Sequence, residues 1–190
     1  MTMRHPFEWL SPTAQKRALW LLLPLTWVVM LCLQRIGRGL VTKYAPHGII
    51  SFEFAGNAAT ASAILGSWMS LGARFDAGLS LGLDYLYMPL YASSIALCCV
   101  LLCQQATPFV QQVGALLAWG QFFAALLDAV ENYALIQVLQ GEPGDFWPAL
   151  ARNAAIPKFV LVALGLAFVL LTGGWWLGQR LKRKLAASNI

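Results

Sequence analysis

Four long apolar stretches restrict the folds that this chain can adopt. A helix needs about 20 mostly apolar residues to cross the hydrocarbon core of a bilayer, and in lipid every backbone polar group must be paired, as in a helix. The chain is 59% hydrophobic and 11% charged, whereas soluble domains are about 45–50% and about 25%. We therefore predict an all-α integral membrane protein, with residues 1–190 forming a single membrane domain built as a four-transmembrane-helix bundle. The expected spans are about 18–34, 75–104, 109–140 and 149–178.

Residues 49–71 present the main ambiguity in the topology. They are long enough to cross, but the segment is rich in small, weakly apolar residues, and Glu53 and Asn57 lie one helical turn apart. The positive-inside rule places basic chain ends in the cytoplasm, and two cytoplasmic ends require an even number of spans. We therefore expect 49–71 to form an extra outer-surface or re-entrant helix between spans one and two. A five-span alternative stays open, because this topology leaves three basic residues outside: Arg35, Arg38 and Lys43.

Ionisable side chains inside the third span are the strongest functional signal. A carboxylate in hydrocarbon is costly, so such residues usually face a bundle interior or a watery cavity and mark function. Asp128, Glu131 and Asn132 fall on one helical face, with Gln121 beside them. This face should therefore point at partners on other helices.

Three spans place their charged residues at the same depth. Counting 1.5 Å per residue from the outer end of each span, Asp84, Asp128, Glu131 and Lys158 all lie within roughly 18 Å of the outer boundary. The inner halves of the spans carry almost no ionisable residues. We predict that these four side chains meet in the outer half of the bundle, and they are the candidate catalytic residues.

Further residues are predicted to line this pocket and bind a ligand. Tyr87, Met88 and Tyr91 share a helical face with Asp84, and Pro157 adjoins Lys158 and should kink the last span. Glu53 and Asn57 are expected to cover the pocket from the outer segment. The candidate ligand-binding set is Tyr87, Tyr91, Met88, Asn132, Gln121, Glu53, Asn57 and Arg152.

The expected function is to bind or act on a lipid or another amphiphilic small molecule. Neighbouring buried carboxyls can serve as general acid and base, and the architecture is similar to that of the emopamil-binding type of sterol isomerase, a small bundle with buried acids, although no motif is shared. Two alternatives stay open. One is an accessory or assembly protein with structural ion pairs only, and the other is a proton-coupled carrier, which the apolar inner halves of the spans disfavour.

Composition and motifs narrow the partners. The net charge of +5 is concentrated at the chain ends, which suits anionic membrane lipids rather than nucleic acid. No nucleotide-binding or hydrolase motif and no C-x-x-C pair occurs, so we expect no cofactor and no metal site. A homo-oligomer or a partner membrane protein remains open. We expect a bacterial inner (plasma) membrane protein with both termini in the cytoplasm.

Overall fold

The regular structure is helical throughout the part of the chain that this computed structural model describes, residues 4–104, 106–141 and 144–188, with the backbone alone for 181–188. The predicted all-helical class is therefore confirmed. The elements are α1 (Pro12–Gly37), the 3₁₀ turn η1 (Arg38–Leu40), α2 (Ile49–Glu53), α3 (Ala58–Ser70), α4 (Arg74–Cys103), α5 (Pro108–Gln140) and α6 (Phe146–Ser188).

Four of these helices, α1, α4, α5 and α6, are long and apolar enough to cross a membrane, as predicted. The first begins earlier than expected, at Pro12 rather than near residue 18, because Ser11 caps it: the Ser11 Oγ accepts a hydrogen bond from the Ala14 N–H at 3.2 Å. The last runs on to Ser188, ten residues beyond the expected end at 178, since helical structure continues past the apolar run. Apolar run length thus predicts the spans better than their ends.

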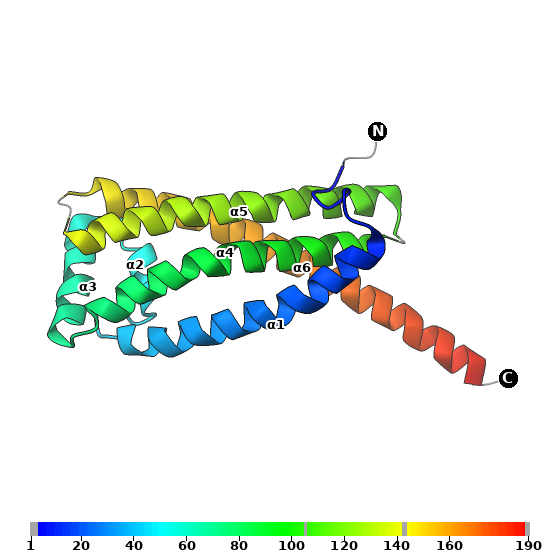
Figure 1. Cartoon of the computed structure of the whole chain (residues 1–190), viewed down its shortest axis with the longest axis horizontal. Helices are drawn as coiled ribbons and strands as arrows, with labels where there is room; N and C mark the ends of the chain where they lie inside the picture. Colours follow the sequence, from blue (N-terminus) through cyan, green and yellow to red (C-terminus); the bar gives the residue numbers. More distant parts are fainter. Residues whose placement is uncertain (1–3, 105, 142–143, 189–190) are drawn as a thin grey trace.

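The long helices alternate in direction and leave α4 at the centre (Figure 1). Helix α5 packs on α4 and α6, while α1 packs mainly on α4. Only Gln15 and Val29 of α1 are buried, so this helix presents most of its apolar surface outward. The C-terminal half of α6 diverges from the other helices and stands clear of the bundle (Figure 1). Helix α1 is therefore attached mainly to α4, whereas α6 packs mainly on α5 and to a lesser extent on α4.

The segment 49–71 forms two short helices rather than the single helix expected. Gly56 has a φ of 72°, which other residues rarely adopt, and Asn57 then caps α3 by accepting a hydrogen bond from the Thr60 N–H at 2.8 Å. The 13 residues of α3 extend only about 20 Å, too short to cross a bilayer. Helix α3 instead lies across one end of the bundle, with α2 beside it (Figure 1).

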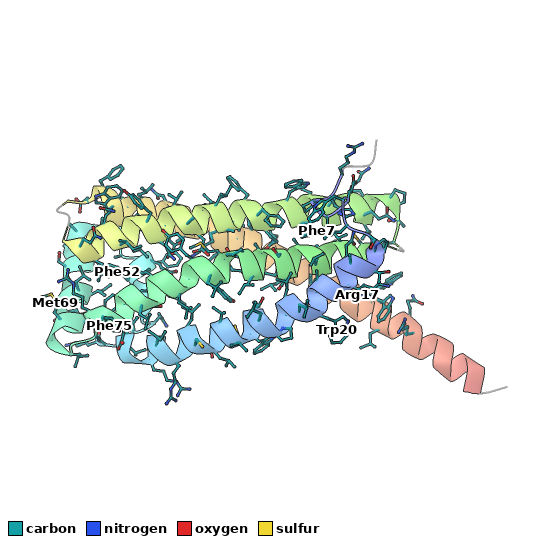
Figure 2. All side chains as sticks on the ribbon, in the orientation of Figure 1. Phe7, Arg17, Trp20, Phe52, Met69 and Phe75 are labelled. Atoms are coloured by element: carbon teal, nitrogen blue, oxygen red, sulfur yellow. The ribbon has the colours of Figure 1, made fainter. Side chains whose placement is uncertain are left out.

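Buried aromatic residues anchor this end cap. The Phe52 and Trp68 rings meet edge to face with centroids 5.1 Å apart, and the Trp68 indole N–H donates to the Leu40 carbonyl at 2.8 Å. Figure 2 shows Phe52 at this end with Met69 and Phe75, and Phe7, Arg17 and Trp20 toward the other. Asp145 tethers α3, because its Oδ1 accepts from the Ala58 N–H at 2.6 Å. Helix α2 itself packs against α5 and α6.

Candidate functional site

Lys158 of α6 is the centre of a buried ion cluster. Its Nζ lies 2.7 Å from Glu131 Oε2 and 3.1 Å from Asp128 Oδ1, both on α5, and 3.8 Å from Glu53 Oε2 on α2. All four residues are buried, and Glu131 is fully so. One lysine therefore faces three carboxyls in a setting where an uncompensated charge is costly.

The chain reaches this point because each helix carries its charge at a similar distance from the capped end. Asp84, Glu131 and Lys158 lie about 15, 14 and 18 Å along α4, α5 and α6 from that end, at 1.5 Å per residue. Helix α2 supplies Glu53 from the cap itself. Pro157, next to Lys158, removes one backbone hydrogen bond within α6. The structure thus brings Asp128, Glu131 and Lys158 into direct contact and adds Glu53, which was expected only as a cover.

Asp84 joins the cluster through an amide. Asn132 Nδ2 donates to Asp84 Oδ2 at 2.9 Å and to the Leu81 carbonyl at 3.3 Å. Because Asn132 directly follows Glu131 in the chain, α5 presents an acid toward α6 and an amide toward α4. This pair of neighbours connects the lysine side of the site to the Asp84 side.

Two tyrosines complete the polar wall on α4. The Tyr91 hydroxyl donates to Asp128 Oδ2 at 3.0 Å, so Asp128 bridges Tyr91 and Lys158. The Tyr87 and Tyr91 rings are 5.3 Å apart between centroids. Tyr91 is thus committed to Asp128, whereas Tyr87 contributes an aromatic surface beside it.

A cavity of about 540 Å³ opens beside the cluster. Its charged residues gather at one end, where Glu53, Asp84, Asp128 and Lys158 line it. Mostly apolar residues of α1, α4 and α6 extend it as far as Cys98 and Val169. From Asp84 to Cys98 the wall runs about 21 Å along α4. Volumes of about 300–1,000 Å³ are usual for small-molecule sites. The cavity is thus elongated, with charge at one end only.

A second cavity of about 390 Å³ adjoins the first on the side of the cap. Glu53, Asp84 and Ile50 line both. This second cavity, called the outer cavity below, also borders Arg38 and His47, which are both exposed. Glu53 and Asp84 therefore stand where the two cavities meet.

Two carboxyls of the cluster keep unfilled acceptors. Glu53 Oε2 and Glu131 Oε1 are buried without a hydrogen-bond donor in the described part of the chain. Burial raises the pKa of the Glu53 carboxyl above its ordinary 4.5; Lys158 opposes this rise and Asp128 adds to it. The site is therefore rich in acceptors and short of donors.

Four of the predicted binding residues lie away from the cavity wall. Met88 is 3% exposed and packs with Tyr91 and Ala92. Gln121 donates across the helices to the Leu161 carbonyl at 2.9 Å, farther from the capped end. Asn57 is exposed and caps α3, and Arg152 is exposed with its side chain beside Gly56. For Met88 and Gln121, a helical face shared with the acids therefore did not predict which groups the side chains contact.

Helix α1 supplies a wall that the sequence interpretation missed. Leu23, Thr26, Trp27 and Met30 line the cavity. They follow the i, i+3, i+4, i+7 spacing of one helical face, so the pattern is visible in the sequence. Because none of these residues is charged, the sequence does not distinguish this face from one that contacts lipid. Thr26 shows the attachment of this wall, since its Oγ1 lies 2.9 Å from the Ser94 Oγ of α4.

Comparisons with known proteins add no family. No protein-family model, curated protein or solved structure matches the chain. Among the described residues, no group of three or more His, Cys, Asp or Glu is placed to hold a metal ion. The geometry of the cluster and its cavities therefore carries the functional argument.

Proposed function

We propose that the protein binds a lipid or another amphiphilic small molecule in the cavity between α1, α4 and α6. The observation that carries this proposal is the division of the cavity wall, with carboxyls and a lysine at one end and mostly apolar side chains along the rest. A mostly apolar pocket with a few convergent polar groups is the usual form of a small-molecule site. A hydrated ion would find only a few hydroxyl and thiol groups along the rest of this length.

The exposure of the wall indicates a sideways entrance. Trp27 on α1 and Leu166 on α6 line the cavity and remain 59% and 45% exposed, whereas Tyr91 on α4 is 5% exposed. Helix α4 therefore forms the floor and α1 and α6 the sides. In a bilayer this opening faces the acyl chains, so a ligand already dissolved in the membrane enters without crossing water.

The carboxyls on the wall also suit proton exchange with a bound ligand. Glu53, Asp84 and Asp128 border the cavity and are the carboxyls within reach of a substrate. Glu131 is fully buried and contacts Lys158, so it acts on a ligand through the lysine. Catalysis on this site would therefore require Asp128, Asp84 or Glu53 as the acid or base.

The orientation that fits this function places the capped end outside a bacterial inner membrane, with both termini in the cytoplasm. Both chain ends lie at the bundle end opposite α3 (Figure 1), and both are basic. A membrane-impermeant thiol reagent added outside cells should label Gly144→Cys and spare Lys16→Cys, in a background without the native cysteines. The reverse pattern would invert the proposed orientation.

Cross-linking tests ligand binding directly. A long-chain fatty alcohol carrying a diazirine should label residues of the cavity, such as Trp27 and Leu166, in protein held in lipid nanodiscs. Val162→Trp, which fills the cavity, should reduce this labelling several-fold. Leu164→Trp is the matched control, because Leu164 is on the same helix, 51% exposed, and not part of the wall. Labelling spread evenly over the lipid-facing surface and insensitive to Val162→Trp would refute the proposal.

A further inference from the structure

Resting on the binding function above, we propose that the polar end of the ligand is a cation, an amine or ammonium group, seated between Glu53 and Asp84. The cluster holds four carboxyls, Glu53, Asp84, Asp128 and Glu131, around one lysine. A further positive charge would reduce this imbalance, and an anion would increase it.

The carboxyls divide into two groups by their partners. Asp128 and Glu131 lie close to Lys158, at 3.1 and 2.7 Å, and Asp128 also accepts from Tyr91. Glu53 is farther from the lysine, at 3.8 Å, and Asp84 accepts from the neutral amide of Asn132. Lys158 therefore compensates the α5 acids first and leaves Glu53 and Asp84 with less positive charge nearby.

Position singles out the same two residues. Glu53 and Asp84 border both cavities, whereas Glu131 borders neither. The remaining wall of the large cavity, the one of about 540 Å³, is apolar apart from Asp128, Lys158 and a few hydroxyl and thiol groups. A ligand whose tail fills this cavity must therefore bring its polar end to the junction. The two least compensated carboxyls are thus the first groups that the head of a ligand meets.

Glu53 supplies independent evidence for a missing donor. The residue is 8% exposed, and its Oε2 has no hydrogen-bond donor in the described part of the chain. A buried acceptor left unfilled costs free energy, and an ammonium group brings up to three N–H donors to such acceptors. The adjoining Tyr87 ring offers a face of the kind that attracts cations.

An anionic head finds no comparable place. Lys158, the cation on the wall of the large cavity, already contacts two carboxyls closely. Arg38 borders the outer cavity but is exposed, where water and salt screen its charge. A neutral head would leave the acid excess uncompensated. The expected ligand is therefore a single-headed cationic amphiphile whose tail runs between α1 and α6.

Competition against the fatty-alcohol photoprobe tests the head group. Dodecylamine, which is protonated at neutral pH, should displace the probe at a concentration about tenfold or more below that of dodecanol. Dodecyl phosphate should be the weakest competitor. This order is expected for a site that pairs carboxylates with a cation. Glu53→Gln and Asp84→Asn should each remove most of the preference for the amine. Both should keep probe labelling, which shows that the cavity is intact. Asp76→Asn, on α4 but outside both walls, and Glu8→Gln should keep the preference.

The outcomes separate this inference from the binding function. Labelling of the cavity with equal competition by amine, alcohol and phosphate, or with phosphate strongest, would overturn the cation inference and leave amphiphile binding standing. A full amine preference in both Glu53→Gln and Asp84→Asn would also overturn it. Absence of cavity labelling by the photoprobe would remove the binding function, and the cation inference with it.

Discussion

Buried polar groups near the α2–α3 cap and those in the rest of the bundle are satisfied in different ways. Away from the cap they are neutral and mostly donate to backbone carbonyls: Gln15 Nε2 to Phe7 and Leu10 at 3.0 and 3.1 Å, and Gln121 Nε2 to Leu161 at 2.9 Å. Near the cap most of them are charged, pair with one another, and leave acceptors unfilled. Gln121 Oε1 is the single unfilled acceptor of the first kind within the described residues.

Under the proposed function, the neutral groups hold helices together and the charged groups contact a ligand. A neutral amide paired with a carbonyl fixes two helices at small cost, because its donors are filled within the protein. An acid cluster with one lysine carries a desolvation cost that apolar side chains would avoid. The presence of this costly cluster at the wall of a cavity is the physical reason for proposing a function at the capped end of the bundle.

The largest effect should follow removal of the central charge. Lys158→Met leaves Asp128 and Glu131 buried without their cation, and loss of one partner of a buried ion pair costs about 3–5 kcal/mol. Denaturation of the variant in mild detergent should show this loss against wild type. Neutralising the acids as well, in Lys158→Met with Asp128→Asn and Glu131→Gln, should recover much of it. An equal loss in the triple variant would assign the effect to packing.

Packing around Gln121 provides the next test, in the neutral part of the bundle. A Cβ on Gly165 would overlap the Gln121 amide and approach Ile95 Cγ2 at 3.0 Å, and overpacking of this kind costs about 1–3 kcal/mol. Gly165→Ala should therefore lower the free energy of unfolding. Gly174→Ala is the control, because a Cβ there meets nothing within 4 Å. Equal stability of the two variants would mean that α5 and α6 separate easily at this level.

The pH dependence of the free energy of unfolding should show how much the ionised Glu53 carboxyl destabilises the folded protein. Its pKa in the folded protein is raised above the ordinary 4.5, so the folded state binds the proton more tightly and stability falls as the pH rises from that value through the raised pKa. Glu53→Gln mimics the protonated side chain and should lack this fall. Unfolding measured across this range should show the variant equal to wild type at the acid end and more stable at the alkaline end. A gap that closes with rising pH would reverse the sign argued here.

The smallest effect should come from the hydroxyl pair between α1 and α4. Thr26→Val removes the contact with Ser94, and interhelical hydrogen bonds in membrane proteins average about 0.6 kcal/mol. Thr172→Val is a matched control, because the Thr172 hydroxyl donates within α6, to the Phe168 carbonyl. If both variants lose the same stability in detergent, the bond between helices adds nothing beyond local structure.

The same contrast explains how much the sequence could predict. Run length located the four long helices, and depth along them placed Asp84, Asp128, Glu131 and Lys158 in one half of the bundle. The position of a residue along its helix does not show which neighbouring helix its side chain faces. Gln121 was predicted to bind the ligand, but its amide donates to the Leu161 carbonyl of α6, away from the cavity.

Other features could not be predicted from the length of the apolar runs or from the positions of charges along them. The break at Gly56 between α2 and α3 depends on a backbone turn that composition does not reveal. It directs Glu53 into the cluster, whereas Asn57 caps α3 at the surface. The contribution of α1 to the cavity could not be inferred from charge, because its lining residues are apolar or neutral.

The tryptophans of α6 indicate how deep the charged cluster lies. From Trp147 to Trp176 the helix rises about 43 Å, close to the roughly 40–45 Å of a bilayer with its headgroup regions, and tryptophan favours those two interfaces. Arg180 stacks over the Trp176 ring at 3.8 Å from its centroid, as suits a residue at the headgroup level. Lys158 then lies about 16 Å below Trp147, within the acyl-chain region. The head group of the proposed ligand would lose its hydration shell at this depth, and the protein groups that replace that water would then determine which head groups bind.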